Sequence, residues 1–352
     1  MKRKLLKWTG IAAGVLLAIH IVLSVVATHA LNAAQAALRQ DGRPLTLAEI
    51  APPPLPDERN AAVLYRAAVL RLRAAEAEGT NLWQRLHELS VSARKKEPTE
   101  EAQAEVRRLW QDPSAQLALH LIEEGARKPD CRIVADYAAW PQGLEWEDGE
   151  ALSALAGVLT LRARALGGAD PAAAWAAALL ALRVAEAPRQ ERLVQFQARR
   201  LENAAAIAQW IGELRPRVPP APADATVVHE LLAQALDPRS LQAAYDGERI
   251  AWTDSLLAER YREHGHAPAI ASLLRYGSWL KLELAAFNRI QHEEARMVAE
   301  SVPDAVRAER LRRVTPAWAF LVRTFWVPKL QELQRVIGPS LDQLRRVQSA
   351  LP

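Results

Sequence analysis

Four carboxylates in one short segment have the composition that acid–base chemistry requires. They are Glu145, Glu147, Asp148 and Glu150. Paired carboxyl groups support hydrolysis when one is buried and protonated while the other is solvated and ionised. A simpler interpretation is a solvated acidic loop that leads into a helix, because acidic side chains interact favourably with helix N-termini. We prefer this second interpretation and keep a hydrolase that uses the 145–150 loop as an alternative.

A second polar segment has the composition of a metal site. It contains Glu259, Glu263, His264 and His266. Two metal ligands on a helix normally lie at i and i+4, as in HExxH, so that they share one face. Gly265 separates the two histidines, and HExxH is absent from the sequence. The segment therefore predicts a polar helix end, and the His264/His266 region stays a second alternative location for a hydrolase.

Other catalytic signatures are missing from the sequence. It contains no GxSxG, no glycine-rich phosphate loop and no CxxC. The single cysteine, Cys131, cannot form an internal disulfide and is typical of a small core residue. The net charge of +4 is spread among intermixed acids and bases, which argues against nucleic acid as a partner. We therefore assign no catalytic, cofactor-binding or metal-binding residue, expect no cofactor, and regard an enzyme as the less favoured class.

An apolar stretch near the start of the chain, Thr9–Thr28, sets where these segments are placed. It carries no charged residue, and its length matches the roughly 20 residues that cross a hydrocarbon core. A cleaved signal has a shorter apolar core of about 7–15 residues. The nearest Ala-x-Ala, at 34–36, is late for cleavage. The sequence predicts an uncleaved transmembrane signal anchor at 9–28 that contacts the lipid bilayer.

The charges around the anchor predict its orientation. Four Lys and Arg residues lie in the flank at 1–8, whereas only Arg39 and Arg43 follow the anchor closely. The positive-inside rule then keeps the N-terminus in the cytoplasm and exports the rest of the chain. In a Gram-negative cell this describes a single-pass protein of the inner membrane with a periplasmic body.

Small residues inside the anchor suggest self-association. Gly10, Gly14 and Ala18 have the small-xxx-small spacing that lets two membrane helices approach closely. The sequence therefore allows a homodimer through these three residues, although small residues are common in such segments.

The rest of the chain has the pattern of an all-α protein. We expect a juxtamembrane helix and Pro-rich spacer at 29–56 and a helical periplasmic body at 57–352, with candidate internal boundaries near 126–149 and 215–224. Two helices that meet at Gly167-Gly168 and Asp170-Pro171 predict an antiparallel hairpin. The spacing is weakly tetratricopeptide-like, but no fixed period recurs. We predict an irregular stack of antiparallel α-hairpins.

Some polar and aromatic residues in this body have expected structural roles. Asn60 should cap a helix, and Glu248-Arg249 should form an interhelical ion pair. His292-Glu293-Glu294 has the pattern of a solvated helix face. Aromatic and basic residues between Trp318 and Lys329 are typical of a core, with contact to a membrane surface as the alternative.

Three stretches of the body together resemble a group of known proteins. They are PPLPDERNAAVLYRAA at 53–68, the KPDCRIVADYAAW loop with the hairpin that follows it, and LQAAYDGERIAWTD at 241–254. They resemble a loose group of N-terminally membrane-anchored, all-helical proteins of Gram-negative, planctomycete-like bacteria. The resemblance implies the fold and the membrane placement. The group has no established activity, so no catalytic residue is transferred.

These observations lead to one expected function. We expect a membrane-tethered helical scaffold or protein-interaction module in the cell envelope, with a partner protein that the sequence does not identify. The alternatives are the hydrolase described above and a carrier that holds apolar ligands in a cavity between helices.

Overall fold

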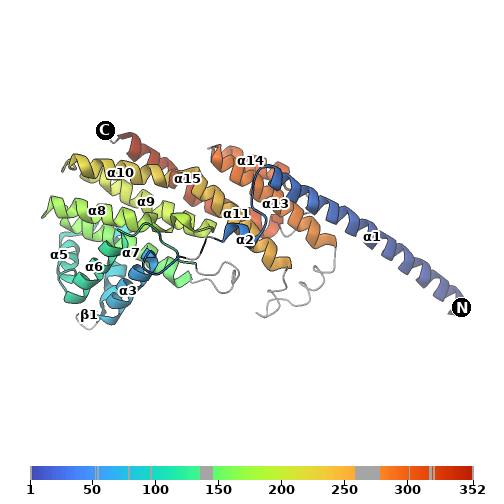
Figure 1. Ribbon diagram of the computed structural model, residues 1–352, viewed down its shortest axis with the longest axis horizontal. Helices are drawn as coiled ribbons and strands as arrows, with labels where there is room; N and C mark the ends of the chain where they lie inside the picture. Colours follow the sequence, from blue (N-terminus) through green and yellow to red (C-terminus); the bar gives the residue numbers. More distant parts are fainter. Residues whose placement is uncertain are drawn as a thin grey trace. The chain divides into compact units, whose positions relative to one another are not determined.

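The computed structural model describes residues 2–51, 53, 55–77, 80–95, 97–134, 146–257, 278–300, 302–316, 319 and 322–350. Helices dominate these residues, as Figure 1 shows, and the strands β1 (Glu76–Ala77) and β2 (Thr80–Asn81) form one short antiparallel pair. The predicted all-α class is confirmed. The chain divides into two compact units.

The first unit contains residues 1–51, 137–142 and 245–332. Its described elements are α1 (Lys2–Gln40), α2 (Leu47–Ile50), most of α11 (Pro238–Leu257), α13 (Ser278–Ala299), α14 (Asp304–Val314) and the π-helical turn η4 (Val322–Trp326). Segments from the beginning and the last third of the sequence therefore fold together.

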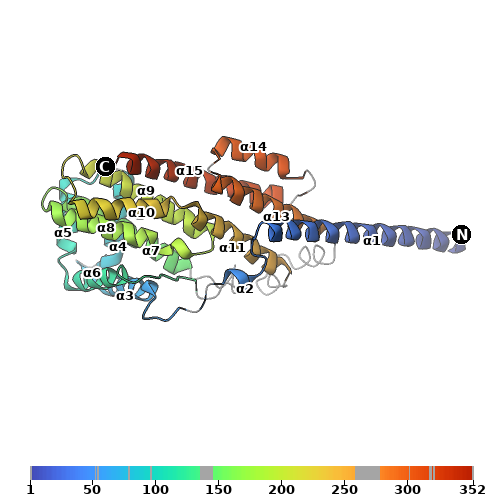
Figure 2. The same ribbon diagram turned by 45° about the horizontal axis from the view of Figure 1, so that its top comes forward.

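Helix α1 changes its environment along its length. Its 39 residues correspond to roughly 58 Å of helix, and its N-terminal part projects beyond α13 in Figure 1 and Figure 2. Between Trp8 and Val26, large apolar side chains are exposed on all sides of the helix. Among the residues that the structure describes, α1 is the one helix long and apolar enough to cross a membrane.

From Ala27 onward, α1 buries a single stripe. Four residues at three- and four-residue spacing form it, namely Ala27, Leu31, Ala34 and Leu38. Leu31 and Ala34 share a core cluster with Leu280, Leu284 and Ala285 of α13. This spacing is that of an amphipathic helix docked on a protein surface. The C-terminal third of α1 is therefore part of the folded unit.

The second unit contains residues 52–136, 143–244 and 333–352. Its helices are α3 (Ala61–Ala74), α4 (Leu82–Lys95), α5 (Glu100–Leu109), α6 (Pro113–Gly125), α7 (Trp146–Leu166), α8 (Pro171–Glu186), the 3₁₀ turn η2 (Ala187–Gln190), α9 (Val194–Leu214), α10 (Pro222–Ala235) and the later part of α15 (Val327–Ala350). Helix α8 is buried on nearly all sides, because it is apolar all round and rich in alanine.

Two local predictions are confirmed in this unit. Helices α7 and α8 pack on each other as the expected hairpin, and the Asp170 carboxylate accepts a hydrogen bond from the Ala173 amide at 3.0 Å. The Asn60 side chain caps α3 by accepting from the Ala62 amide at 3.1 Å. It also accepts from the Arg132 amide at 2.9 Å, which ties the start of α3 to a distant loop.

The structure divides the chain inside one candidate boundary region, 126–149, and also at places where the sequence shows no break. Residues 29–40 continue α1, and α2 follows with a capping box between Thr46 and Glu49 and with Ile50 buried. Much of the expected spacer at 29–56 is thus folded into the first unit. Another division falls between Ala244 and Tyr245, inside α11, rather than at 215–224. A helix that continues through a boundary leaves no break in composition for the sequence to reveal.

A glycine pair tests the packing of the second unit. A Cβ atom at Gly125 would lie 2.8 Å from Cε1 of the buried Tyr65 ring, whereas a Cβ at Gly168 would meet nothing within 4 Å. We expect Gly125→Ala to lower the free energy of unfolding by about 1–3 kcal/mol, because the tyrosine must move. Gly168→Ala should change it by less than about 0.5 kcal/mol. Urea denaturation followed by circular dichroism measures both, and equal effects would contradict the packing of α3 on α6.

Candidate functional site

The acidic segment begins α7, which starts at Trp146. Glu150 is 63% exposed at its side chain and pairs with Arg199 of α9, with 3.0 Å between Oε1 and Nη2. Glu145 and the side chains of Glu147 and Asp148 lie outside the described residues. The member of the group that is described is therefore a surface residue with a surface ion pair.

The proposed histidine region lies outside the structure's described residues. Glu259, Glu263, His264 and His266 all fall within 258–277. Elsewhere, in the parts of the chain that are described, no group of three or more His, Cys, Asp or Glu side chains could hold a metal ion. Most side chains of the stripe between Trp318 and Lys329 are also outside the description, although Val322 is buried and Arg323 is exposed.

A buried ionic network in the first unit holds the segment that follows α1. The Asp246 carboxylate on α11 pairs with Arg43 at 3.2 Å and with Arg249 at 3.3 Å. The Arg249 guanidinium, which is 2% exposed, also donates to the Pro44 carbonyl and, at 3.4 Å, to Oδ1 of Asn288 on α13. Three separate chain segments therefore meet on one guanidinium.

Burial and pairing oppose each other in this network. Burial raises the pKa of Asp246, while the guanidinium groups of Arg43 and Arg249 counteract this rise. Burial likewise lowers the pKa of Arg249 against the opposing effect of Asp246. Each charge is tolerated inside the unit because its partners are present, so removal of one partner leaves the others uncompensated.

A second part of the network involves residues expected on a solvated face. Glu294 is 0% exposed, accepts a hydrogen bond from the Tyr245 hydroxyl at 3.2 Å and lies 3.9 Å from Nε of Arg307. His292 is mostly buried and its Nε2 lies 2.9 Å from Oδ2 of Asp41. The prediction of a solvated face at 292–294 was wrong, because one turn of α13 points between neighbouring helices.

The expected Glu248-Arg249 ion pair needs a similar correction. Arg249 pairs with Asp246 on its own helix and reaches other segments through Pro44 and Asn288. Glu248 is itself buried. A charged pair in the sequence shows that partners are required, but the tertiary fold selects them.

The second unit contains a cleft of about 980 Å³ between α7, α9 and the segment that joins α4 to α5. Small residues line facing parts of its walls, including Ala156 and Gly157 on α7 and Ala206 on α9. Side chains this small leave space between helices that larger residues would fill. The cleft is thus a direct consequence of the alanine and glycine content of α7 and α9.

The charged residues of the cleft have both signs. Glu202 and Glu213 of α9 line it together with Arg164 of α7 and Arg217. Arg164 donates to the Ala93 carbonyl at 3.1 Å, and its buried Nε has no hydrogen-bond partner in the described chain. The described lining residues include neither His nor Cys.

The cleft also bears on the carrier alternative. Its lining combines charged side chains, amides such as Asn203 and Gln209, and the largely buried Trp210. Apolar ligands occupy predominantly apolar cavities, whereas this lining offers many hydrogen-bonding groups. It suits a polar or peptide-like ligand better than an apolar one.

One pattern in the sequence of α11 indicates the buried ionic network. Asp246 and Arg249 are one helical turn apart in α11 and are interleaved with Tyr245 and Ile250, which are buried. Charged residues within an otherwise apolar helix indicate buried pairs. No comparable sequence pattern indicates the cleft, because alanine and glycine occur both on packed helix faces and on faces that line an open space.

Removing the shared carboxylate tests the network. Asp246→Asn leaves two largely buried guanidiniums without their carboxylate, so we expect about 3–5 kcal/mol less stability for the first unit. Glu309→Gln, which breaks an exposed pair with Arg313 on α14 of the same unit, should have no measurable effect. Urea titration of detergent-solubilised protein compares the two variants, and similar midpoints would show that the network contributes little.

The cysteine provides a pH-dependent test of the second unit. Burial, reinforced by Glu191, raises the pKa of the Cys131 thiol. The native protein should therefore react with iodoacetamide at pH 9 much more slowly than the urea-unfolded chain, because the thiolate is the reactive form. The protonated Cys131 thiol also stabilises the folded state relative to the unfolded chain. This contribution is fully present below the pKa of the unfolded thiol and is lost as the pH rises through the higher pKa of the native thiol. Equal labelling rates would show that Cys131 is accessible.

Comparisons of this chain with protein-family models, curated proteins and solved structures found no match. The geometry of α1, of the ionic network and of the cleft is therefore the basis for proposing a function.

Proposed function

We propose that the protein is a single-pass membrane protein that displays a helical interaction scaffold in the cell envelope. The observation that carries this proposal is the change of exposure along α1 at Ala27. Before that residue apolar side chains cover every side of the helix, and after it a single stripe is buried. A contiguous exposed apolar surface of this kind is unfavourable in water and is satisfied by a bilayer.

The docking of α1 supports retention of the anchor. The Ala-x-Ala sequence at 34–36 lies in the part of α1 that packs on α13, and both Ala34 and Leu38 are buried. Cleavage there would remove Ala27, Leu31 and Ala34 from the core of the first unit. An uncleaved signal anchor is therefore the form in which this unit keeps its packing.

The charge distribution supports a specific membrane and orientation. The basic flank at 1–8 favours an N-terminus in the cytoplasm and the export of both units, which in a Gram-negative cell means the inner membrane and the periplasm. The resemblance to anchored helical proteins of such bacteria agrees with this placement. The mixed charges outside the flank fit a protein partner rather than nucleic acid.

Within the bilayer, one side of α1 is free to meet a second copy. A Cβ atom added at Gly14 would meet nothing within 4 Å, and Ala18 is exposed. Ala18 precedes the buried Ala27 by nine residues, which is about 180° around a helix. Gly14 and Ala18 therefore lie on the side of α1 away from the stripe that α13 covers, and Gly10 lies at the edge of that side, about 100° from Ala27.

The scaffold function is supported by the cleft of the second unit. Its amide and charged side chains offer donors and acceptors of the kind that bind polypeptide segments. We propose that a segment of a partner protein binds there.

Membrane insertion is tested with two matched arginine substitutions. Val22 on α1 and Leu70 on α3 are 60% and 56% exposed, so neither substitution disturbs a core. Val22→Arg should shift protein from the carbonate-resistant membrane fraction to the soluble fraction, since arginine at mid-membrane costs about 2.5–3.5 kcal/mol. Leu70→Arg should leave fractionation unchanged. Recovery of wild-type protein as a soluble chain that begins after residue 36, shown by mass spectrometry, would refute the anchor.

The cleft is tested with a photo-crosslinking amino acid placed in living cells. At Ala206, in the cleft, it should yield one discrete adduct of higher mass, and at the exposed Ala176 of α8 it should yield none. The same adduct from Gln209 would show that the partner lies along α9. Diffuse or identical products from all three positions would contradict a specific partner site.

A further inference from the structure

We propose that the end of the first unit nearest the apolar part of α1 binds the phosphate groups of anionic phospholipids through Lys281 and Arg323. This inference rests on the proposed insertion of α1 into a membrane. It adds a second contact with the bilayer, made by the folded unit rather than by the anchor.

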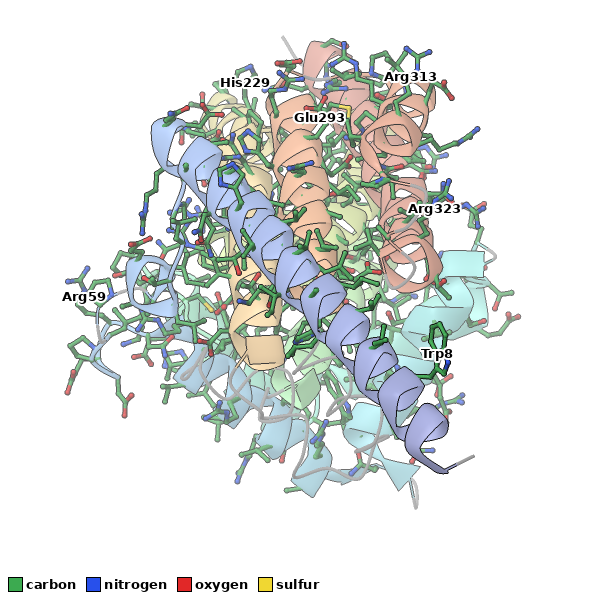
Figure 3. The ribbon with its side chains drawn as sticks, turned by 90° about the vertical axis from the view of Figure 1, so that its right-hand side faces the viewer. Trp8, Arg59, His229, Glu293, Arg313 and Arg323 are labelled. Carbon is green, nitrogen blue, oxygen red and sulfur yellow. The ribbon has the colours of Figure 1, made fainter. Side chains whose placement is uncertain are left out.

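The register between two helices places Lys281 at the membrane boundary. Nζ of Lys281 lies 2.9 Å from Oγ1 of Thr28, and Nε2 of His292 lies 2.9 Å from Oδ2 of Asp41. Residue numbers rise in the same direction along both helices, so α13 runs parallel to α1 and starts near Thr28. Figure 3 shows α1 lying across the face of α13.

The height of Lys281 follows from the helix geometry. Thr28 is two residues beyond Val26, the last large apolar residue of the exposed run, which corresponds to roughly 3 Å along the axis. If Val26 is at the edge of the hydrocarbon core, the Lys281 ammonium is at the level of the lipid headgroups. The amino end of α13, with the positive end of its dipole, lies at the same level.

The charge of Lys281 is not neutralised by the described part of the chain. Its ammonium contacts the neutral Thr28 hydroxyl, and no described carboxylate forms an ion pair with it. An ammonium group has three donor hydrogens, so two remain for other acceptors. Phosphate oxygens of headgroups are the abundant acceptors at this level, and a lysine there is attracted to an anionic leaflet.

The turn η4 brings a second cation near the same end of α13. The Val322 amide donates to Oε2 of the buried Glu283 at 3.3 Å, and Glu283 is two residues beyond Lys281 on α13. Arg323, the next residue, is exposed and labelled in Figure 3. A guanidinium binds phosphate bidentately, which suits it to a headgroup.

The opposite end of α13 has a different charge arrangement. Arg296 pairs there with Glu293 at 2.8 Å, and Glu300 lies 3.7 Å from Arg310. These arginines are balanced by acids of the same unit. At the other end of α13, where α1 leaves the apolar segment, Lys281 and Arg323 have no such described pair.

Fluorescence quenching in nanodiscs tests this contact with full-length protein. A fluorophore on Thr324→Cys, in a Cys131→Ala background, reports the position of η4, since Thr324 is exposed beside Arg323. We expect headgroup spin-labelled lipid to quench it more strongly in discs with phosphatidylglycerol than in discs of phosphatidylcholine alone. Lys281→Gln combined with Arg323→Gln should abolish this difference, because each cation contributes roughly fivefold to binding an anionic surface.

A matched charge control isolates the location. Arg312→Gln combined with Arg313→Gln removes the same charge from exposed residues of α14 and should leave the difference intact. If the phosphatidylglycerol-dependent difference in quenching is lost in this control as well, the proposal is overturned, because the difference would then depend on net charge alone. Competition by millimolar inorganic phosphate at constant ionic strength would also overturn it, by showing a site for a soluble anion.

A second fluorophore position separates this inference from the anchor. A label on Val22→Cys should be quenched by lipids spin-labelled in the acyl chain. No quenching there would refute the insertion of α1. Quenching at Val22 without a phosphatidylglycerol-dependent signal at Thr324 would refute the headgroup contact alone.

Discussion

Along one side of α1, the side chains of Ala27, Leu31, Ala34 and Leu38 are buried, and the described apolar residues before them form no such stripe. The helix is continuous between these two environments. Since an α-helix without proline or a bulge is stiff over this length, the docked part fixes the direction of the exposed part. The proposed placement of the first unit at a membrane, and every lipid contact proposed for that unit, depend on this junction.

The ionic network reinforces the junction just beyond the end of α1. Arg43 and Pro44 follow the helix, and both are held by α11 through Asp246 and Arg249. Buried ion pairs add little net stability over apolar packing but strongly disfavour arrangements in which one partner is missing. We interpret the network as a specificity device that allows the segment after α1 only one position on the unit. A purely apolar junction would tolerate a slip of the helix by one turn more easily.

The second unit has a different character. Its helices are packed by alanine and leucine, with α8 buried in the middle, and a few polar contacts are buried among them. One of them is the pair between Arg200 and Glu186, 2.7 Å apart and almost fully buried, in which burial raises the pKa of Glu186. The same small residues that allow close packing around α8 also leave the cleft between α7 and α9. A partner segment that binds there would fill space that the chain itself leaves open.

The sequence by itself determined the helical class, the apolar segment with its basic flank, the caps at Asn60 and Asp170 and the α7–α8 hairpin. These features depend on hydrophobic periodicity and on short-range capping, which neighbouring residues specify locally. Only the tertiary structure decided that 29–50 fold against α11 and α13, that Glu294 is buried and which groups Arg249 binds. These contacts join residues as far apart as Pro44 and Arg249, and a polar residue at helical spacing has the same pattern whether water or another helix faces it. For the same reason the cleft and the position of Arg323 near the start of α13 could be found only once the helices were placed side by side.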